Sequence, residues 1–161
     1  MQVRLATMAD AKHLCDIYNR EVEESTATLD LVARTLEQQR AYLVDRSGGL
    51  AVVIAEIGGE VAGFASLSFY RDRPGYRTSV EDSIYVDRGA QGQGVGHALL
   101  GQLVTLATNH GFHSMFARIV DQQPASVALH QKHGFSIVGV EREVARKFGR
   151  WHDVALMQRL L

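Results

Sequence analysis

The sequence predicts an α/β protein with a mixed, mostly antiparallel central sheet that is flanked by helices on both faces. Apolar residues recur at helical spacing in some segments, whereas other segments carry dense or alternating apolar runs of strand length. Some expected strands follow one another through a short turn, and others are separated by a helix. Direct pairing together with helical crossovers indicates a mixed sheet that is covered on both sides.

The first fifty residues predict one strand and two helices. Residues 2–6 alternate enough to form an opening strand. Thr7 and Asp10 then resemble a capping box, with an acid in place of the usual Glu or Gln, at the start of a helix over about 8–24. A second helix is expected over about 33–45, before a Ser-Gly-Gly break. The apolar face of the first helix carries Leu14, Ile17, Tyr18 and Val22.

The rest of the chain predicts six strands, two more helices and a glycine-rich loop. Gly58 and Gly59 mark a two-residue hairpin turn between two apolar runs. The glycine-rich loop lies between a strand and a long helix. In chain order the expected elements are strands over 50–57, 60–70 and 79–86, a helix over about 95–111, a strand over 112–120, a short helix over 124–134, and strands over about 135–146 and 151–160.

Length and composition indicate a single domain, 1–161, because two domains would leave each half small for a core of its own. The formal net charge of -1 gives no global basic surface, so we expect no nucleic-acid partner. No apolar run approaches the roughly 18 residues that cross a bilayer, and the N-terminus lacks the apolar stretch of a secretory signal, so we expect no membrane partner. Cys15 is the only cysteine, which favours a cytoplasmic protein.

The glycine-rich loop over 87–96 precedes a helix, an arrangement that exposes backbone N–H groups and the positive helix end to a phosphate. Two familiar phosphate-binding motifs do not fit it. A P-loop needs Lys followed by Ser or Thr, and the sequence contains no such pair. The dinucleotide fingerprint needs glycine where His97 stands. The loop is therefore either a phosphate-binding loop of another kind or a tight turn without a ligand.

The residues around the loop are more specific. Gln91-x-x-Gly94-x-Gly96, after a strand and before a long helix, resembles the acyl-CoA pyrophosphate loop of the GNAT superfamily of N-acetyltransferases. Within that superfamily, three stretches resemble the phosphinothricin and methionine sulfoximine acetyltransferase group: 76–86 (YRTSVEDSIYV), 126–135 (SVALHQKHGF) and 147–153 (KFGRWHD). The segment 17–19 is similar too, so the resemblance covers nearly the whole chain and implies the GNAT fold and acetyl-CoA as co-substrate.

The resemblance assigns specific residues to acetyl-CoA. It implies that Gln123, which stands where relatives commonly have asparagine, contacts the pantetheine arm. Lys132 matches a basic position near the CoA phosphates, and its alternative role is an exposed helix lysine. The remaining assigned residues are Ile84, Tyr85 and Val86, whose backbone groups line the pantetheine, and Gly92, Gln93, Gly94, Val95, Gly96 and His97, which hold the pyrophosphate.

Glu81 is the candidate general base. An amine attacks a thioester only as the free base, so the enzyme needs a group that removes its proton and donors that stabilise the oxyanion. Glu81 lies in an expected strand next to apolar Val80, where burial would raise the pKa of a carboxyl group, and it matches the glutamate of the resembling group. The alternative is a structural glutamate paired with an arginine. Asp82 points to the opposite face by strand alternation and is expected to be structural.

Arginines precede the candidate base in the loop 71–78. Guanidinium groups recognise carboxylates and similar anions bidentately. Arg71, Arg73 and Arg77 therefore favour an anion-bearing amine as substrate, although each alone is equally compatible with a solvated loop. Tyr70 and Arg71 match an aromatic and a basic position of the resembling group, so the expected substrate-binding residues are Tyr70, Arg71, Arg73 and Glu81.

Other polar residues have weaker claims to a role. The resembling family often uses a tyrosine to reprotonate the thiolate, but the helix over 124–134 contains none, so the acid is open and His130 is one candidate. Cys15 is expected to pack within its helix. We expect no metal site, because no third ligand motif follows His130 and His133. His152 and Asp153 are adjacent and project oppositely, which argues against a triad.

Together these observations predict an acetyl-CoA-dependent N-acetyltransferase that acetylates the α-amine of a small amino-acid-like acceptor. The resemblance suggests methionine sulfoximine, methionine sulfone or phosphinothricin, and it implies a homodimer. Two alternatives stay open. One is acetylation of a protein or peptide N-terminus, which would need an open groove. The other is a non-catalytic acyl-CoA-binding module, which would need neither Glu81 nor the three arginines.

Overall fold

The computed structural model describes residues 1–161 and contains one seven-stranded sheet. Neighbouring strands are antiparallel except β4 and β5, which are parallel, so the predicted mixed, mostly antiparallel sheet is confirmed. The spatial order is β1-β2-β3-β4-β5-β7-β6, which places the last strand inside the sheet. The strands are β1 (Gln2–Leu5), β2 (Val53–Ile57), β3 (Glu60–Phe69), β4 (Ser79–Val86), β5 (Ser114–Val120), β6 (Ser136–Lys147) and β7 (Arg150–Leu160).

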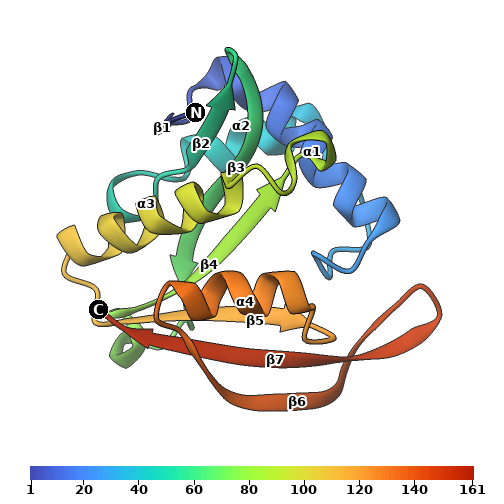
Figure 1. Ribbon diagram of the computed structural model, residues 1–161, viewed down its shortest axis with the longest axis vertical. Helices are drawn as coiled ribbons and strands as arrows, with labels where there is room; N and C mark the ends of the chain where they lie inside the picture. The colour runs from blue at the N-terminus through green and yellow to red at the C-terminus, as the bar shows by residue number, and fades with distance from the viewer.

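Helices cover both faces of the sheet, as predicted (Figure 1). Because side chains alternate along a strand, Ile54 and Phe64 pack against α1, whereas their neighbours Val53 and Ala65 join the core under α3. The helices α1 and α2 therefore lie on one face, and α3 and α4 on the other. Their bounds are Ala11–Glu24 for α1, Leu36–Val44 for α2, Val95–Asn109 for α3 and Pro124–Lys132 for α4.

The element order is as predicted, and the differences at element ends have local causes. The second helix begins at Leu36, not at residue 33, because Thr35 caps it. The Gln38 backbone N–H donates to Thr35 Oγ1 over 3.1 Å, and the Thr35 N–H donates back to Gln38 Oε1 over 2.8 Å. The second strand begins at Val53 because Gly48–Leu50 forms a 3₁₀ turn.

Asp10 forms the predicted contact with Thr7 at the start of the first helix. Its carboxylate accepts from the Thr7 N–H over 2.7 Å and from both terminal nitrogens of Arg4 over 2.9 Å. The chain makes one 3₁₀ turn, Met8–Asp10, before α1 begins at Ala11. Asp10 therefore joins β1 to the start of the first helix.

The sheet splits between its two parallel strands. β4 and β5 pair only at their beginnings, where Ser79, Val80 and Glu81 lie opposite Ser114, Met115 and Phe116. Beyond Glu81, β4 stays paired with β3 up to Val86, and β5 stays paired with β7 up to Val120. The two strands diverge after the shared segment (Figure 1), so one edge of β4 is left without a strand partner. None of the helices combines the length and the apolar character that crossing a membrane requires.

Candidate active site

A cleft of about 1200 Å³ lies where β4 and β5 diverge. Its walls come from segments that are far apart in the chain. These are the second half of β4, the glycine-rich loop with the start of α3, the end of β5, α4 with the residue before it, the loop 26–29 after α1, and part of the β6–β7 hairpin. The split in the sheet therefore creates an open site that reaches from the α3 and α4 face to the opposite face.

The glycine-rich loop forms one end of the cleft and begins α3. Gly92 and Gly94 have positive φ angles of 76° and 83°, which glycine adopts without steric cost. Gly94 is the N-cap of α3, so the first N–H groups of the helix have no partner within it. The loop and helix-start residues Gln91, Gly92, Gly94, Val95, Gly96 and His97 line the cleft. This end can therefore bind a phosphate or pyrophosphate group.

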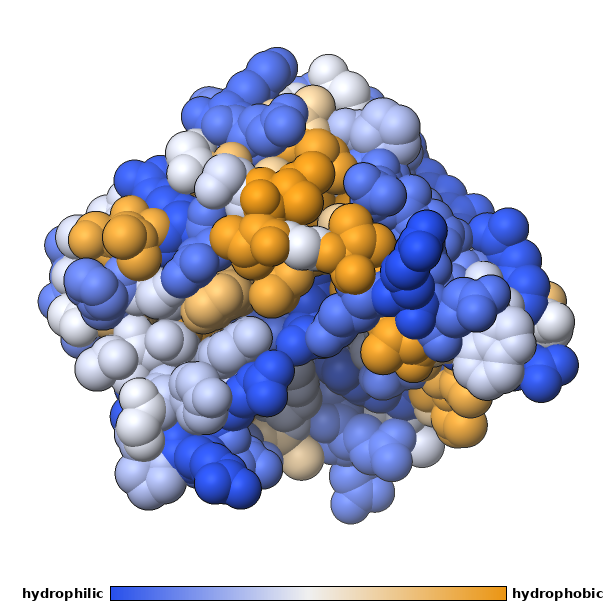
Figure 2. Space-filling model, turned by 90° about the horizontal axis from the view of Figure 1, so that it is seen from below, coloured by the Kyte–Doolittle hydropathy of each residue, from blue (hydrophilic) through white to orange (hydrophobic).

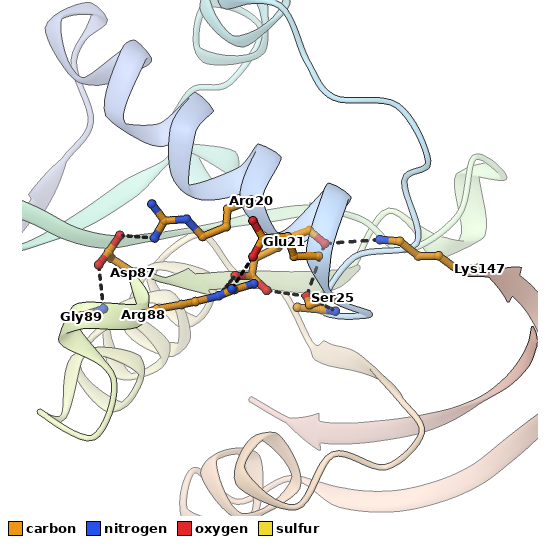
Figure 3. A network of polar contacts seen from close by, with 9 residues as sticks. Arg20, Glu21, Ser25, Asp87, Arg88, Gly89 and Lys147 are labelled. Atoms are coloured by element: carbon orange, nitrogen blue, oxygen red, sulfur yellow. Dashed lines mark hydrogen bonds and ion pairs between the residues drawn. The ribbon is translucent and has the colours of Figure 1, made fainter. Parts of the chain in front are cut away.

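Ion pairs attach the start of the glycine-rich loop to α1 (Figure 3). Arg88 donates to Glu21 over 3.2 Å and to Glu24 over 2.6 Å, and Arg20 lies 3.4 Å from Asp87. Asp87 also accepts from the Gly89 N–H over 2.8 Å. These contacts hold the turn that follows β4 against the last turns of α1, and they fix where the loop begins.

Most of the residues that sequence reasoning assigned to acetyl-CoA lie in the cleft wall. Ile84, Tyr85 and Val86 line it beside the free edge of β4. Gln93 does not line the cleft, because its side chain folds back and donates to the Gly89 carbonyl over 3.0 Å. The others in the wall are Gly92, Gly94, Val95, Gly96, His97, Gln123 and Lys132.

An unusual turn brings Gln123 to the cleft. Asp121 and Gln122 both have φ angles of 50°, in the left-handed region that non-glycine residues rarely adopt. Asp121 is held there by an ion pair with Arg150 over 2.9 Å and by a hydrogen bond with Nδ1 of His152 over 2.8 Å. The turn ends β5 and begins α4 directly after Gln123, and strain of this kind is common at functional sites.

Glu81 lies on the side of the cleft opposite the glycine-rich loop, beside the charged residues Arg118 and Glu141. Arg118 of β5 donates through Nε to Glu81 over 3.1 Å and through Nη1 to Glu141 of β6 over 2.9 Å. Burial raises the pKa of Glu81 above its ordinary value, although the charge and hydrogen bond of Arg118 act in the other direction. Glu81 is thus a partly buried carboxylate that can accept a proton closer to neutral pH than an exposed glutamate can.

Asp82 points to the other face of β4, as strand alternation predicts, and contacts His130 of α4. The His130 Nε2 atom lies 3.3 Å from Asp82 Oδ1, and Nδ1 lies 2.7 Å from the Ser126 carbonyl oxygen. Because a carbonyl oxygen only accepts, Nδ1 carries a hydrogen, and the contact between Nε2 and Asp82 needs a second proton. Burial alone would lower the pKa of His130, but the Asp82 carboxylate raises it overall.

The arginines of the loop 71–78 are exposed and do not line the cleft. Tyr70 lies on the Glu81 face of the sheet and stacks on Phe116 at a centroid distance of 4.1 Å. The Arg71 guanidinium lies 5.1 Å from the Tyr70 ring, and that of Arg77 lies 5.2 Å from the ring of Phe69. Arg71 therefore lies beside Tyr70 on the Glu81 face, whereas Arg77 lies beside Phe69 on the other face.

Several other singled-out residues lie in structural positions. Cys15 is buried in α1, outside the cleft wall. His152 is fully buried, whereas Asp153 accepts from the Glu143 N–H over 2.8 Å, so the two neighbours have separate partners. His133 contacts His97 over 2.9 Å rather than His130. The structure brings together no three His, Cys, Asp or Glu side chains in an arrangement that could hold a metal ion.

Sequence reasoning missed Arg118 and Glu141. Both line the cleft, and Arg118 lies 37 residues from Glu81 in the sequence. One signal was available, since Arg118 is the only charged residue in the otherwise apolar run 115–120. A charged residue inside an otherwise apolar strand is unusual and suggests a functional site.

The split sheet, the glycine-rich helix start and the partly buried glutamate form a cleft that can hold a phosphorylated group-transfer substrate beside an amine. The model of the acetyltransferase (GNAT) family matches residues 11–135. The chain belongs to this family. The resemblance noted in the sequence is therefore confirmed.

Full-length relatives support the narrower grouping. A phosphinothricin N-acetyltransferase of Streptomyces coelicolor is 39% identical to this chain, and the match covers 100% of this chain and 96% of the relative. An L-methionine sulfoximine/L-methionine sulfone acetyltransferase of Salmonella typhimurium is 36% identical, with 98% of this chain and 92% of the relative covered.

Solved structures agree over the whole fold. A ribosomal-protein-alanine N-acetyltransferase from Brucella melitensis superposes with a TM-score of 0.97 at 38% identity, and both chains are covered to 100%. A phosphinothricin acetyltransferase from Sinorhizobium meliloti, solved in complex with acetyl-CoA, gives a TM-score of 0.95 at 37% identity, with 99% of this chain and 88% of that chain covered. The predicted fold class is confirmed by these structures.

Proposed function

We propose that this protein transfers an acetyl group from acetyl-CoA to the α-amine of a small amino-acid-like acceptor, such as methionine sulfoximine, methionine sulfone or phosphinothricin. The observation that carries this proposal is the cleft itself. It has a glycine-rich helix start suited to a pyrophosphate at one end and a partly buried glutamate at the other. The names of the relatives support the same class of acceptor.

Acetyl-CoA fits the end of the cleft that the glycine-rich loop forms. The pyrophosphate would accept hydrogen bonds from the free N–H groups at the start of α3, where Gly92 and Gly94 leave room for close approach. The extended pantetheine would lie along the free edge of β4, from Ile84 to Val86, next to Gln123. Lys132 would lie near the phosphates.

Glu81 would begin the reaction. Its carboxylate removes a proton from the acceptor ammonium, and the neutral amine attacks the thioester carbonyl carbon. Backbone N–H groups near Val86 would stabilise the oxyanion of the tetrahedral intermediate. When the intermediate collapses, the carbon–sulfur bond breaks and the electron pair leaves with the CoA thiolate. His130, whose Nε2 atom lies 3.3 Å from Asp82 Oδ1 in the cleft wall, is the residue that we assign to reprotonate this thiolate.

Acetylation of a protein N-terminus is the second candidate, because one solved neighbour is named a ribosomal-protein-alanine N-acetyltransferase. The two activities need different acceptor sites, since a peptide must extend out of the cleft. The loop 26–29 and the β6–β7 hairpin both line the cleft on the Glu81 side. The names of the full-length relatives favour a small acceptor. A non-catalytic acyl-CoA-binding module is disfavoured, because cofactor binding alone needs no partly buried base.

The test is release of free CoA thiol from acetyl-CoA with a panel of acceptors. The panel contains methionine sulfoximine, methionine sulfone, phosphinothricin, the proteinogenic amino acids and short peptides with Ala or Ser at the N-terminus. We expect thiol release with one or more small amino acids and a product that mass spectrometry identifies as the Nα-acetyl derivative. Faster turnover of the peptides would favour the second candidate, and no thiol release with any acceptor would refute the enzymatic function.

A homodimer and a cytoplasmic location belong to the same proposal. β6 is an edge strand of the sheet and has exposed apolar side chains along it. Figure 2, which views the molecule from the side of β6 in Figure 1, shows apolar side chains gathered near the middle of this face. An exposed apolar edge strand is suited to pairing with a second copy of the chain. The free thiol of Cys15 supports the cytoplasm.

A further inference from the structure

Arg118 has an unusual position beside the proposed base. Its guanidinium group lies between the carboxylates of Glu81 and Glu141, which belong to the strands β4 and β6. The side chain lines the cleft and keeps 33% of its surface exposed. Nε and Nη1 make the two ion pairs, whereas Nη2 has no hydrogen-bond partner in the protein. Part of the guanidinium fork is therefore available to a ligand.

The arrangement matches the charges of an α-amino acid. An α-amino acid carries an ammonium group and a carboxylate on the same carbon atom. The carboxylate of Glu81 and the guanidinium of Arg118 are in direct contact, with 3.1 Å between Oε2 and Nε. An acceptor whose ammonium group reaches Glu81 therefore brings its own carboxylate close to Arg118.

We propose that Arg118 binds the α-carboxylate of the acceptor and so selects α-amino acids over simple amines. This inference rests on the proposed acetyltransferase function. Arginine suits the role because its planar fork can hold one carboxylate while it donates to another. Glu141 keeps the guanidinium oriented in the free protein and also competes with the acceptor for its positive charge.

The exposed arginines of the loop 71–78 have a different place in this scheme. Arg71 lies over Tyr70, beyond the stack that Tyr70 forms with Phe116. The side chain of an acceptor held by Glu81 and Arg118 has two directions open to it, toward this stack or away from it. In the first direction, Arg71 and Arg73 would interact with an anionic group at the far end of the side chain, but not with the α-carboxylate.

A purely structural role for Arg118 makes a different prediction. If Arg118 only held Glu81 in place, or only adjusted its pKa, removal of the guanidinium would affect every acceptor equally. If Arg118 binds the α-carboxylate, the effect falls on acceptors that carry this group. The two roles are separated by comparing two acceptors that differ only in the carboxylate.

The experiment measures the Michaelis constants of methionine sulfone and of 3-(methylsulfonyl)propylamine, its decarboxylated counterpart, at one pH. For Arg118→Gln we expect the constant for methionine sulfone to rise by about 10- to 100-fold, as for loss of a hydrogen bond to a charged group, and that for the amine to change less than about 3-fold. Arg118→Lys keeps the charge without the fork and should give an intermediate increase. Arg142→Gln, which removes an exposed arginine of β6 outside the cleft wall, should change neither constant.

Glu141→Gln provides a second variant at a more exposed site, which tests the proposal even if replacement of Arg118 prevents folding. Without the competing carboxylate, the Michaelis constant for methionine sulfone should fall, and that for the amine should not. Equal changes for both acceptors in the Arg118 and Glu141 variants would overturn the assignment to Arg118. Failure of the wild-type protein to release thiol with either acceptor, or with any of the wider panel, would instead refute the proposed function and the inference with it.

Discussion

Two adjacent carboxylates in β4 have different environments because strand geometry sends them to opposite faces. Glu81 meets Arg118 and Glu141 on the face that carries α1, and Asp82 meets His130 on the face that carries α4. Burial raises the pKa of Glu81, which suits a base. At the residue scale, the position in the strand therefore gives two adjacent carboxylates different faces and different partners.

Asp10 gives the clearest stability prediction for a single residue. The hydrogen bonds from Arg4 lower the pKa of Asp10 from its ordinary value of 3.8 to about 2, which corresponds to roughly 2 kcal/mol of folding stability. Because the folded-state pKa is the lower one, this stability is present above about pH 4 and is lost as the pH falls toward 2. We expect Asp10→Asn to unfold more easily at pH 7, by about that amount, in urea denaturation.

The pH dependence supplies the check on Asp10. The difference in the free energy of unfolding between wild type and Asp10→Asn should shrink as the pH falls from about 4 to 2. Asp16→Asn is the matched control, because the Asp16 carboxylate pairs with Lys12 at an exposed site and such pairs contribute little. A difference that stays constant with pH would show that the carboxylate charge of Asp10 is not the cause.

How far the site can be predicted from the sequence depends on the range of the contacts. Glu81 can be found because its own strand gives it apolar neighbours and a defined face. Arg118 and Glu141 come near Glu81 only through the pairing of the three other strands β5, β7 and β6. The contact between Arg118 and Glu81 spans 37 residues of the sequence, and that between Arg118 and Glu141 spans 23. Local patterns do not contain that pairing, so these two partners appear only in the folded sheet.

At the scale of elements, Gly63 allows β3 and β4 to lie close to α3. A Cβ atom on Gly63 would lie 2.7 Å from the Tyr85 carbonyl oxygen and 3.1 Å from a Cγ atom of Val95. Gly63→Ala should therefore displace the backbone of β4 where pantetheine is proposed to lie. We expect a loss of about 1–3 kcal/mol of stability, as is typical of overpacking, and a higher Michaelis constant for acetyl-CoA.

A second strand glycine provides the control for Gly63. Gly139 of β6 has no heavy atom within 4 Å of the place where a Cβ would be. Gly139→Ala should therefore keep both the melting temperature and the Michaelis constant for acetyl-CoA near the wild-type values. If both alanine variants behave alike, the close approach at Gly63 does not matter.

Lys147 connects the β6–β7 hairpin to the loop after α1. Lys147 is 3% exposed, and its Nζ donates to the Glu21 carbonyl over 3.3 Å (Figure 3). Nζ also donates to the Thr28 carbonyl over 2.7 Å. Lys147→Met should cost about 1–3 kcal/mol, because these carbonyl groups lose their partner. The loop 26–29 lines the part of the cleft where we propose that the acceptor binds, so the Michaelis constant for the acceptor should rise more than that for acetyl-CoA.

Arg146 offers the comparison for Lys147. It is the preceding residue and is exposed, with its guanidinium 5.4 Å from the Trp151 ring. Arg146→Met should leave both Michaelis constants unchanged. Equal increases for the acceptor and for acetyl-CoA in Lys147→Met would indicate general destabilisation and not a looser acceptor loop.

The elements themselves were largely predictable, whereas their arrangement was less so. Helix periodicity, the hairpin glycines and the glycine-rich loop each act within about 15 residues, and the order of elements followed from them. The position of β7 between β5 and β6 does not, because it depends on which strands pair across the sheet. The split between β4 and β5, which makes the cleft, is a property of that arrangement.

At the scale of the whole molecule, the exposed apolar strand β6 predicts self-association. Val138 and Val140 are 51% and 40% exposed on this edge strand. We expect light scattering to give a mass of twice the 17.8 kDa chain for the wild type, and the chain mass for the double variant Val138→Lys with Val140→Lys. The control is Val44→Lys in α2, an exposed site of 71% away from β6, which should remain a dimer. A wild-type monomer at micromolar concentration would rule out the dimer.

The central claim is that Glu81 is the base of an acetyl transfer in the cleft, and the pH dependence of kcat/KM tests it most directly. A base works when ionised, so the wild-type rate should fall as the pH drops through the pKa of Glu81, which burial has raised above the ordinary value for glutamate. Glu81→Gln should lower the rate at neutral pH by about 10²- to 10⁴-fold and lose this acidic limb. A Gln variant that keeps the wild-type rate and the same acidic limb would contradict the account.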